Sequence, residues 1–102
     1  MRLAGVGPVP PGAAAVVVNL TAVAPTDATH ITAFPSGTVR PRASTLNVAA
    51  GETRPNLAVV QPNASGYVAL YNNSGSVDLV VDVFGWFAVG GDEFHPVVPG
   101  RV

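Results

Sequence analysis

The feature that most constrains this chain is a valine-rich sequence that glycine and proline interrupt at short intervals. Its 102 residues include 19 Val and 7 Thr, together with 11 Gly and 10 Pro. β-Branched residues pack well on a pleated sheet and are mediocre helix formers. Glycine and proline end such runs after a few residues. No segment has the apolar spacing of a capped amphipathic helix, so the sequence predicts an all-β fold of short strands.

Alternation of apolar and polar residues predicts where these strands lie. The main strands are expected at 13–23, 29–34, 44–49, 55–61, 67–71 and 77–87, with a short additional strand near 38–40. A spacing of about ten residues between strands is typical of a β-sandwich or a barrel. We therefore expect a Greek-key-like β-sandwich of about seven short antiparallel strands, with a small β-barrel as the alternative.

The last expected strand, 77–87, has apolar residues on both faces. Its odd positions are expected to face the core, because side chains alternate along a strand: Val77, Leu79, Val81, Val83 and Phe87. The other face carries Val80, Phe84 and Trp86. An apolar outer face is typical of a surface that is buried between subunits, so these three residues are candidate assembly contacts.

The length of the chain corresponds to one domain, and we expect a single β domain over 1–102. Residues 1–12 and 90–102 are rich in Gly, Pro and Val. We expect both terminal segments to pack on their own domain or on a neighbouring subunit. The candidate contacts in the C-terminal segment are Phe94, Val97 and Val98.

Charge and cysteine content exclude several classes of function. Charged residues make up 11% of the chain, and the net charge is −1. Five arginines balanced by six acids do not form the basic patch of a nucleic-acid binder. The absence of Cys and Lys removes disulfides, thiolate catalysis and Schiff-base chemistry. The longest apolar run is too short to cross a bilayer, so we expect no membrane insertion.

Polar residues inside the expected strands are interpreted as structural. Asp78 and Asp82 are separated by about 13 Å along a strand, too far to act as paired glycosidase carboxylates or to share one calcium ion. Buried polar groups need hydrogen-bond partners. We therefore expect a structural network that includes Asn19, Asn47, Asn56, Asp78 and Asp82. We expect no catalytic residue, metal site or cofactor.

Aromatic residues offer an alternative binding site, because exposed rings stack on sugars. Tyr67 and Tyr71 share one face of an expected strand, and Trp86 is the single tryptophan. These three rings are the candidate glycan-stacking residues.

Several short motifs occur together in one order along the chain. They are 13–23 (AAAVVVNLTAV), Phe34-Pro35-Ser36-Gly37, Ser44-Thr45-Leu46-Asn47, Pro55-Asn56-Leu57, 71–76 (YNNSGS) and 81–87 (VDVFGWF). The set resembles a β-rich repeat domain of secreted and cell-surface actinobacterial proteins. That domain often recurs in tandem, sometimes beside peptidoglycan-hydrolase or peptidase domains, and its function is unsettled. The resemblance implies an extracellular or cell-surface location, and a neighbouring repeat as partner.

The residues at the two ends suggest a unit cut out of phase with such an array. Residues 94–102 look like the start of a following repeat, whereas 3–7 look like the middle of one. The N-terminus lacks the apolar stretch of a signal peptide, so any export signal is expected outside this chain.

These observations lead to one main functional hypothesis and one alternative. The main hypothesis is a non-catalytic extracellular structural or adhesive module that self-assembles through its terminal segments, as a homo-oligomer or with a tandem neighbour. The alternative is a carbohydrate-binding module for cell-wall or environmental glycan. A hydrolase would need Asp78 or Asp82 beside a second acid, for which Asp92 and Glu93 are the candidates.

Overall fold

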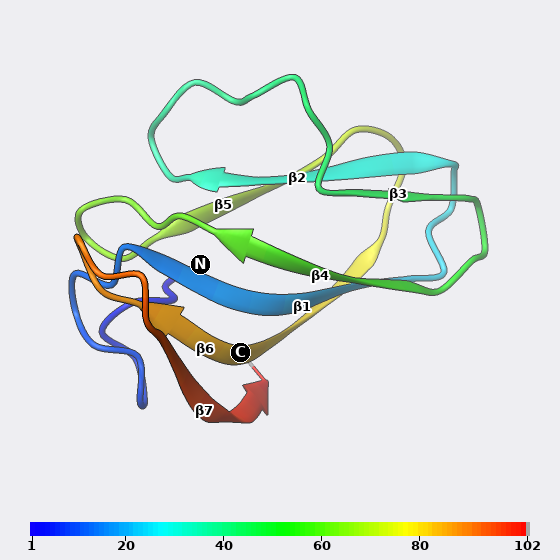
Figure 1. The fold of residues 1–102 in the computed structure, drawn as a ribbon. Helices are drawn as coiled ribbons and strands as arrows, with labels where there is room; N and C mark the ends of the chain where they lie inside the picture. The colour runs from blue at the N-terminus through cyan, green and yellow to red at the C-terminus, as the bar shows by residue number, and fades with distance from the viewer. Residues whose placement is uncertain (102) are drawn as a thin grey trace.

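The computed structural model describes residues 1–101 as two antiparallel sheets, which Figure 1 shows as two layers. The four-stranded sheet has the order β4-β1-β6-β7, and the three-stranded sheet has the order β3-β2-β5. The strands are β1 (Ala15–Val23), β2 (Thr29–Pro35), β3 (Leu46–Val48), β4 (Arg54–Val60), β5 (Val68–Asn72), β6 (Asp78–Phe87) and β7 (Phe94–Arg101). Neither sheet closes on itself within the described residues. The predicted β-sandwich is confirmed, and the alternative of a small barrel is wrong.

Strand β1 is the centre of the four-stranded sheet, with β4 on one side and β6 on the other. Its side chains alternate between buried and partly buried positions along the whole strand. The buried set is Val16, Val18, Leu20 and Ala22. These side chains meet Ile31 of β2 and Val68 of β5 in one continuous core. Side chains that alternate along the strand thus place these four residues together on the core side of the sheet.

Two strand predictions need correction. The segment 38–40 is not a strand, because it belongs to a loop that arches over β2 (Figure 1). The loop covers Thr32, whose hydroxyl donates to the carbonyl of Ala43 at 3.3 Å. Strand β7 was missed, because Pro96 and Pro99 lack the N–H groups that a strand interior normally donates.

The N-terminal segment contributes to the core although it forms no long strand. Leu3, Ala4 and Val9 are almost fully buried. The segment runs antiparallel to β5 through a bridge between Arg2 and Tyr67. The Leu3 N–H donates to the carbonyl of Gly66 at 2.7 Å. Residues 1–3 thus extend the three-stranded sheet beyond β5, and residues 5–9 form a turn next to it.

A β-bulge in β6 changes which side chains face the core. The register with β1 shifts between Val17 and Val18, which leaves Phe84 as the extra residue. Trp86 then pairs with the buried Val16 and packs against the core. Phe87 pairs with Ala15 on the other face. The predicted orientations of Trp86 and Phe87 are therefore wrong, because one extra residue reverses the alternation.

Replacing Leu3 with Ala tests whether the N-terminal segment is part of the core. Leu3 is 2% exposed, so its truncation should lower the free energy of unfolding by about 2–5 kcal/mol. Val6→Ala in the same segment is the matched control, because Val6 is 43% exposed. Its effect should stay within about 0.5 kcal/mol. Urea unfolding measures both variants, and equal effects would contradict this role of the segment.

Candidate functional site

The outer face of the four-stranded sheet, meaning the face opposite the core, carries exposed apolar side chains. The largest are Leu57 (62% exposed), Val59 (65%), Phe84 (36%) and Phe94 (41%). The register places Leu57 opposite Asn19 and Val59 opposite Val17, both on the outward side of β1. These four residues come from three strands, so the sheet itself brings them to one surface.

Phe94 and Phe84 take their positions from the irregular pairing of β6 with β7. Phe94 pairs with Phe87, and their ring centroids are 5.5 Å apart. The Phe94 ring also lies over Gly85, where a Cβ atom would collide with it. Gly85 therefore leaves space for an aromatic ring on the outer face. This is a physical reason for glycine in the interior of β6.

The middle of the outer face is polar and nearly neutral. Asp82 pairs with Asn19 in the register of β1 and β6. The Arg101 Nε donates to the Asp82 carboxylate at 3.2 Å. Val80, a predicted contact, lies opposite Thr21 and is partly buried. The ion pair neutralises Asp82 in the polar middle of the face, whereas Asp78, on the same face, is exposed at its end and forms no ion pair within residues 1–101.

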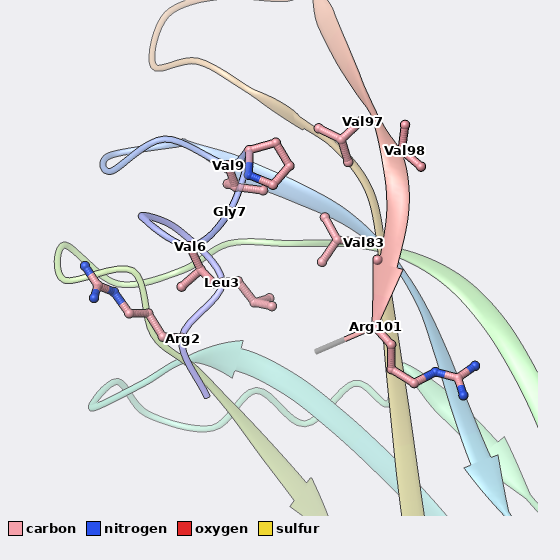
Figure 2. A pocket seen from close by; sticks show the side chains of 11 residues that line it. Arg2, Leu3, Val6, Gly7, Val9, Val83, Val97, Val98 and Arg101 are labelled. Carbon is pink, nitrogen blue, oxygen red and sulfur yellow. The ribbon is translucent and has the colours of Figure 1, made fainter.

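A second surface feature is an apolar recess of about 160 Å³ between the N-terminal segment and β7. Figure 2 shows Leu3, Val9, Val83 and Val97 around it. Val98 also lines it and is mostly exposed. The Arg2 and Arg101 side chains extend away from the recess on either side (Figure 2). Both terminal segments thus meet at one open edge of the sandwich, with no guanidinium directed into the recess.

The opposite edge of the sandwich is held together by polar side chains. Asn56 of β4 donates from Nδ2 to the carbonyl of Thr45 at 2.7 Å. Arg54 donates to the carbonyl of Asn47 at 3.3 Å, and the Asn47 side chain accepts from the Ser44 hydroxyl at 3.0 Å. Asn47 and Asn56 line a shallow polar recess of about 300 Å³ between β3 and β4. Both asparagines thus bind groups of the fold itself, although both residues are exposed.

The remaining residues of the expected polar network differ in their hydrogen-bond partners and in their exposure. Asn19 donates to the Thr21 hydroxyl at 3.4 Å, a long contact on the outer face. Asp82 binds Arg101, whereas Asp78 is exposed at the start of β6. Within residues 1–101, no three His, Asp or Glu side chains gather closely enough to hold a metal ion.

The three candidate glycan-stacking rings differ in how open they are. The Arg40 guanidinium lies 3.6 Å from the centroid of the Tyr71 ring, so one face of that ring is covered. The Trp86 ring stacks on the His95 ring, with 4.2 Å between the ring centroids and 14° between the ring planes. Tyr67 is 42% exposed. The structure does not bring these three rings together as one platform, because Trp86 lies on the core side of the four-stranded sheet.

Comparisons of the chain with protein-family models, with curated proteins and with solved structures found no match. In the part of the chain that the structure describes, no helix has the length and apolar character needed to cross a membrane.

Sequence reasoning did not identify Leu57 and Val59 as surface contacts. Residues 57–60 are apolar at every position, so alternation alone does not show which side faces the core. Pairing with β1 decides this, because Val60 lies opposite the buried Val16. Gly85 inside a strand pattern was an available signal for the bulge.

Replacing Gly85 with Ala tests the packing of Phe94 on the outer face. The added Cβ would collide with the Phe94 ring and lie 2.7 Å from the His95 carbonyl oxygen, so β6 and β7 must separate. We expect a loss of about 1–3 kcal/mol in the free energy of unfolding.

Gly100→Ala is the matched control for this variant. Its Cβ would have its nearest neighbour at 4.0 Å, so the stability should hardly change. Urea unfolding measures both proteins. Unchanged stability of Gly85→Ala would show that the Phe94 ring does not occupy this position in solution.

Proposed function

We propose that this chain is a non-catalytic structural module that associates with a second copy through the outer face of its four-stranded sheet. The observation that supports this proposal is the group of exposed apolar side chains on that face, formed by Leu57, Val59, Phe84 and Phe94. Burial of apolar surface contributes about 25 cal/mol per Å², and contiguous apolar patches mark interaction sites.

The charge distribution of the outer face favours association. Cores of protein interfaces are depleted of charged residues and enriched in aromatic ones. Near the centre of this face, Asp82 and Arg101 neutralise each other, and the two phenylalanines lie close by in the β6–β7 pair. The middle of the face can therefore be covered without burying an unpaired charge, because the unpaired Asp78 lies at the end of the face.

The size of the face limits the strength of this association. Neighbouring strands of the sheet are paired over about seven residues, so the paired area is about 19 by 23 Å, which is about 450 Å². A stable interface buries about 800 Å² on each partner. We therefore expect weak association that depends on concentration.

We also propose a location and a role for the molecule. Low charge and the resemblance to a surface-protein repeat support an extracellular or cell-surface location and an adhesive or spacing role. The outer face would then contact a second chain or a tandem neighbour. Binding of glycan has less support, because Arg40 covers one face of Tyr71 and His95 stacks on Trp86.

Replacing Val59 with Asp tests the proposed surface. The wild-type mass should rise above the monomer mass of 10.3 kDa as its concentration increases from micromolar to millimolar. A carboxylate in the interface would be desolvated without a partner, so the variant should dimerise at least tenfold more weakly. Sedimentation equilibrium measures the dissociation constants.

Val39→Asp is the matched control, because Val39 is 94% exposed and lies in the loop over the other sheet. This variant should associate like the wild type. A wild-type chain that stays monomeric throughout, or equal effects of the two substitutions, would contradict the proposal.

A further inference from the structure

The two edges of the four-stranded sheet differ in their capacity to pair with another strand. At one edge, β7 contains Pro96 and Pro99, and its register with β6 shifts between Val83 and Gly85. Prolines and irregular pairing are devices that protect an edge from strand addition. At the other edge, β4 contains one proline, Pro55, which is its second residue.

Strand β4 has an unpaired backbone edge. It pairs with β1 on one side, and within residues 1–101 no backbone hydrogen bond connects Arg54–Val60 to any other segment. The side chains of Arg54 and Asn56 connect it to the carbonyls of Asn47, in β3, and of Thr45, directly before β3. Most of the strand is exposed. An exposed apolar edge strand presents free N–H and C=O groups to another strand.

We propose that β4 of one chain pairs antiparallel with β4 of a second copy, about a two-fold axis at Ala58. This inference rests on the proposed function and specifies the geometry of the first contact. An antiparallel two-fold contact uses the same edge on both copies, so it closes as a dimer. It joins two four-stranded sheets into one sheet of eight strands.

The axis at Ala58 follows from the side chains that it brings together. Leu57 of each copy then lies opposite Val59 of the other, on the outer face. Cross-strand apolar pairs of this kind stabilise a sheet. Pro55 falls at the end of the paired segment, where its missing N–H costs little. The two Arg54 residues are about 26 Å apart along the strands, so they do not repel each other.

Edge pairing also enlarges the outer face, whose small area limits the strength of face-to-face association. One sheet offers about 450 Å², whereas the joined sheet offers about 900 Å² of continuous surface, which exceeds what a stable interface needs. Edge pairing would therefore precede face-to-face packing of two dimers. The second copy is the occupant that these observations favour, because it supplies both the matching edge and the matching face.

Cysteine scanning tests the pairing directly, because the natural chain contains no Cys. Opposed residues of an antiparallel pair have Cα atoms about 4.5–5.5 Å apart, within the range of a disulfide. Ala58→Cys should form a disulfide dimer under mild oxidation. Leu57→Cys and Val59→Cys should cross-link poorly alone and efficiently when mixed. The mixture of Leu57→Cys and Val59→Cys still tests the pairing if Ala58→Cys does not fold, since Ala58 is partly buried.

Two further variants separate the edge contact from the face contact. Phe84→Cys reports contact between outer faces, and Val39→Cys is the exposed control for random collision. Cross-linking of the Leu57→Cys and Val59→Cys mixture well above that control supports edge pairing. Efficient cross-linking of Leu57→Cys alone would overturn the axis at Ala58. Cross-linking of Phe84→Cys without any β4 variant would overturn edge pairing and leave the proposed function standing, whereas a monomeric wild type would overturn both.

Discussion

The burial of alternate side chains along β1 is the constraint on which the rest of the structure depends. β1 is paired on both edges, and its Val16, Val18, Leu20 and Ala22 fill the space between the sheets. A slip of one residue would expose all four, so the register of both neighbours is strongly specified. Because that register is fixed, the outward positions of β4 and β6 follow from it, including those of Leu57 and Val59.

The aromatic part of the outer face depends on one point at which β6 departs from regular alternation. The bulge at Phe84 turns Trp86 inward against the core and leaves Phe87 beside Phe94 on the outside. Gly85 makes room for the Phe94 ring. A local irregularity thus stabilises the core with the largest side chain and concentrates aromatic surface on one face.

The two lateral edges of the sandwich are closed in different ways. Side-chain hydrogen bonds from Arg54 and Asn56 connect β4 to the β3 region, whereas an apolar recess separates the N-terminal segment from β7. Prolines protect the backbone of β7, and no comparable protection covers β4 beyond Pro55. The edge at which we propose self-association is therefore the one that is tied to the other sheet by side chains and not by backbone pairing.

The sequence by itself determined the all-β class and six of the seven strands, because β-branched alternation and Gly-Pro punctuation are local signals. It did not reveal β7, whose prolines conceal a strand, or the burial of Leu3 and Val9. Phe84 and Phe94 were expected at a surface, but Trp86 was placed on the wrong face. Only the tertiary structure decided these points and exposed the edge of β4, because pairing partners, bulges and free edges depend on residues far apart in the chain.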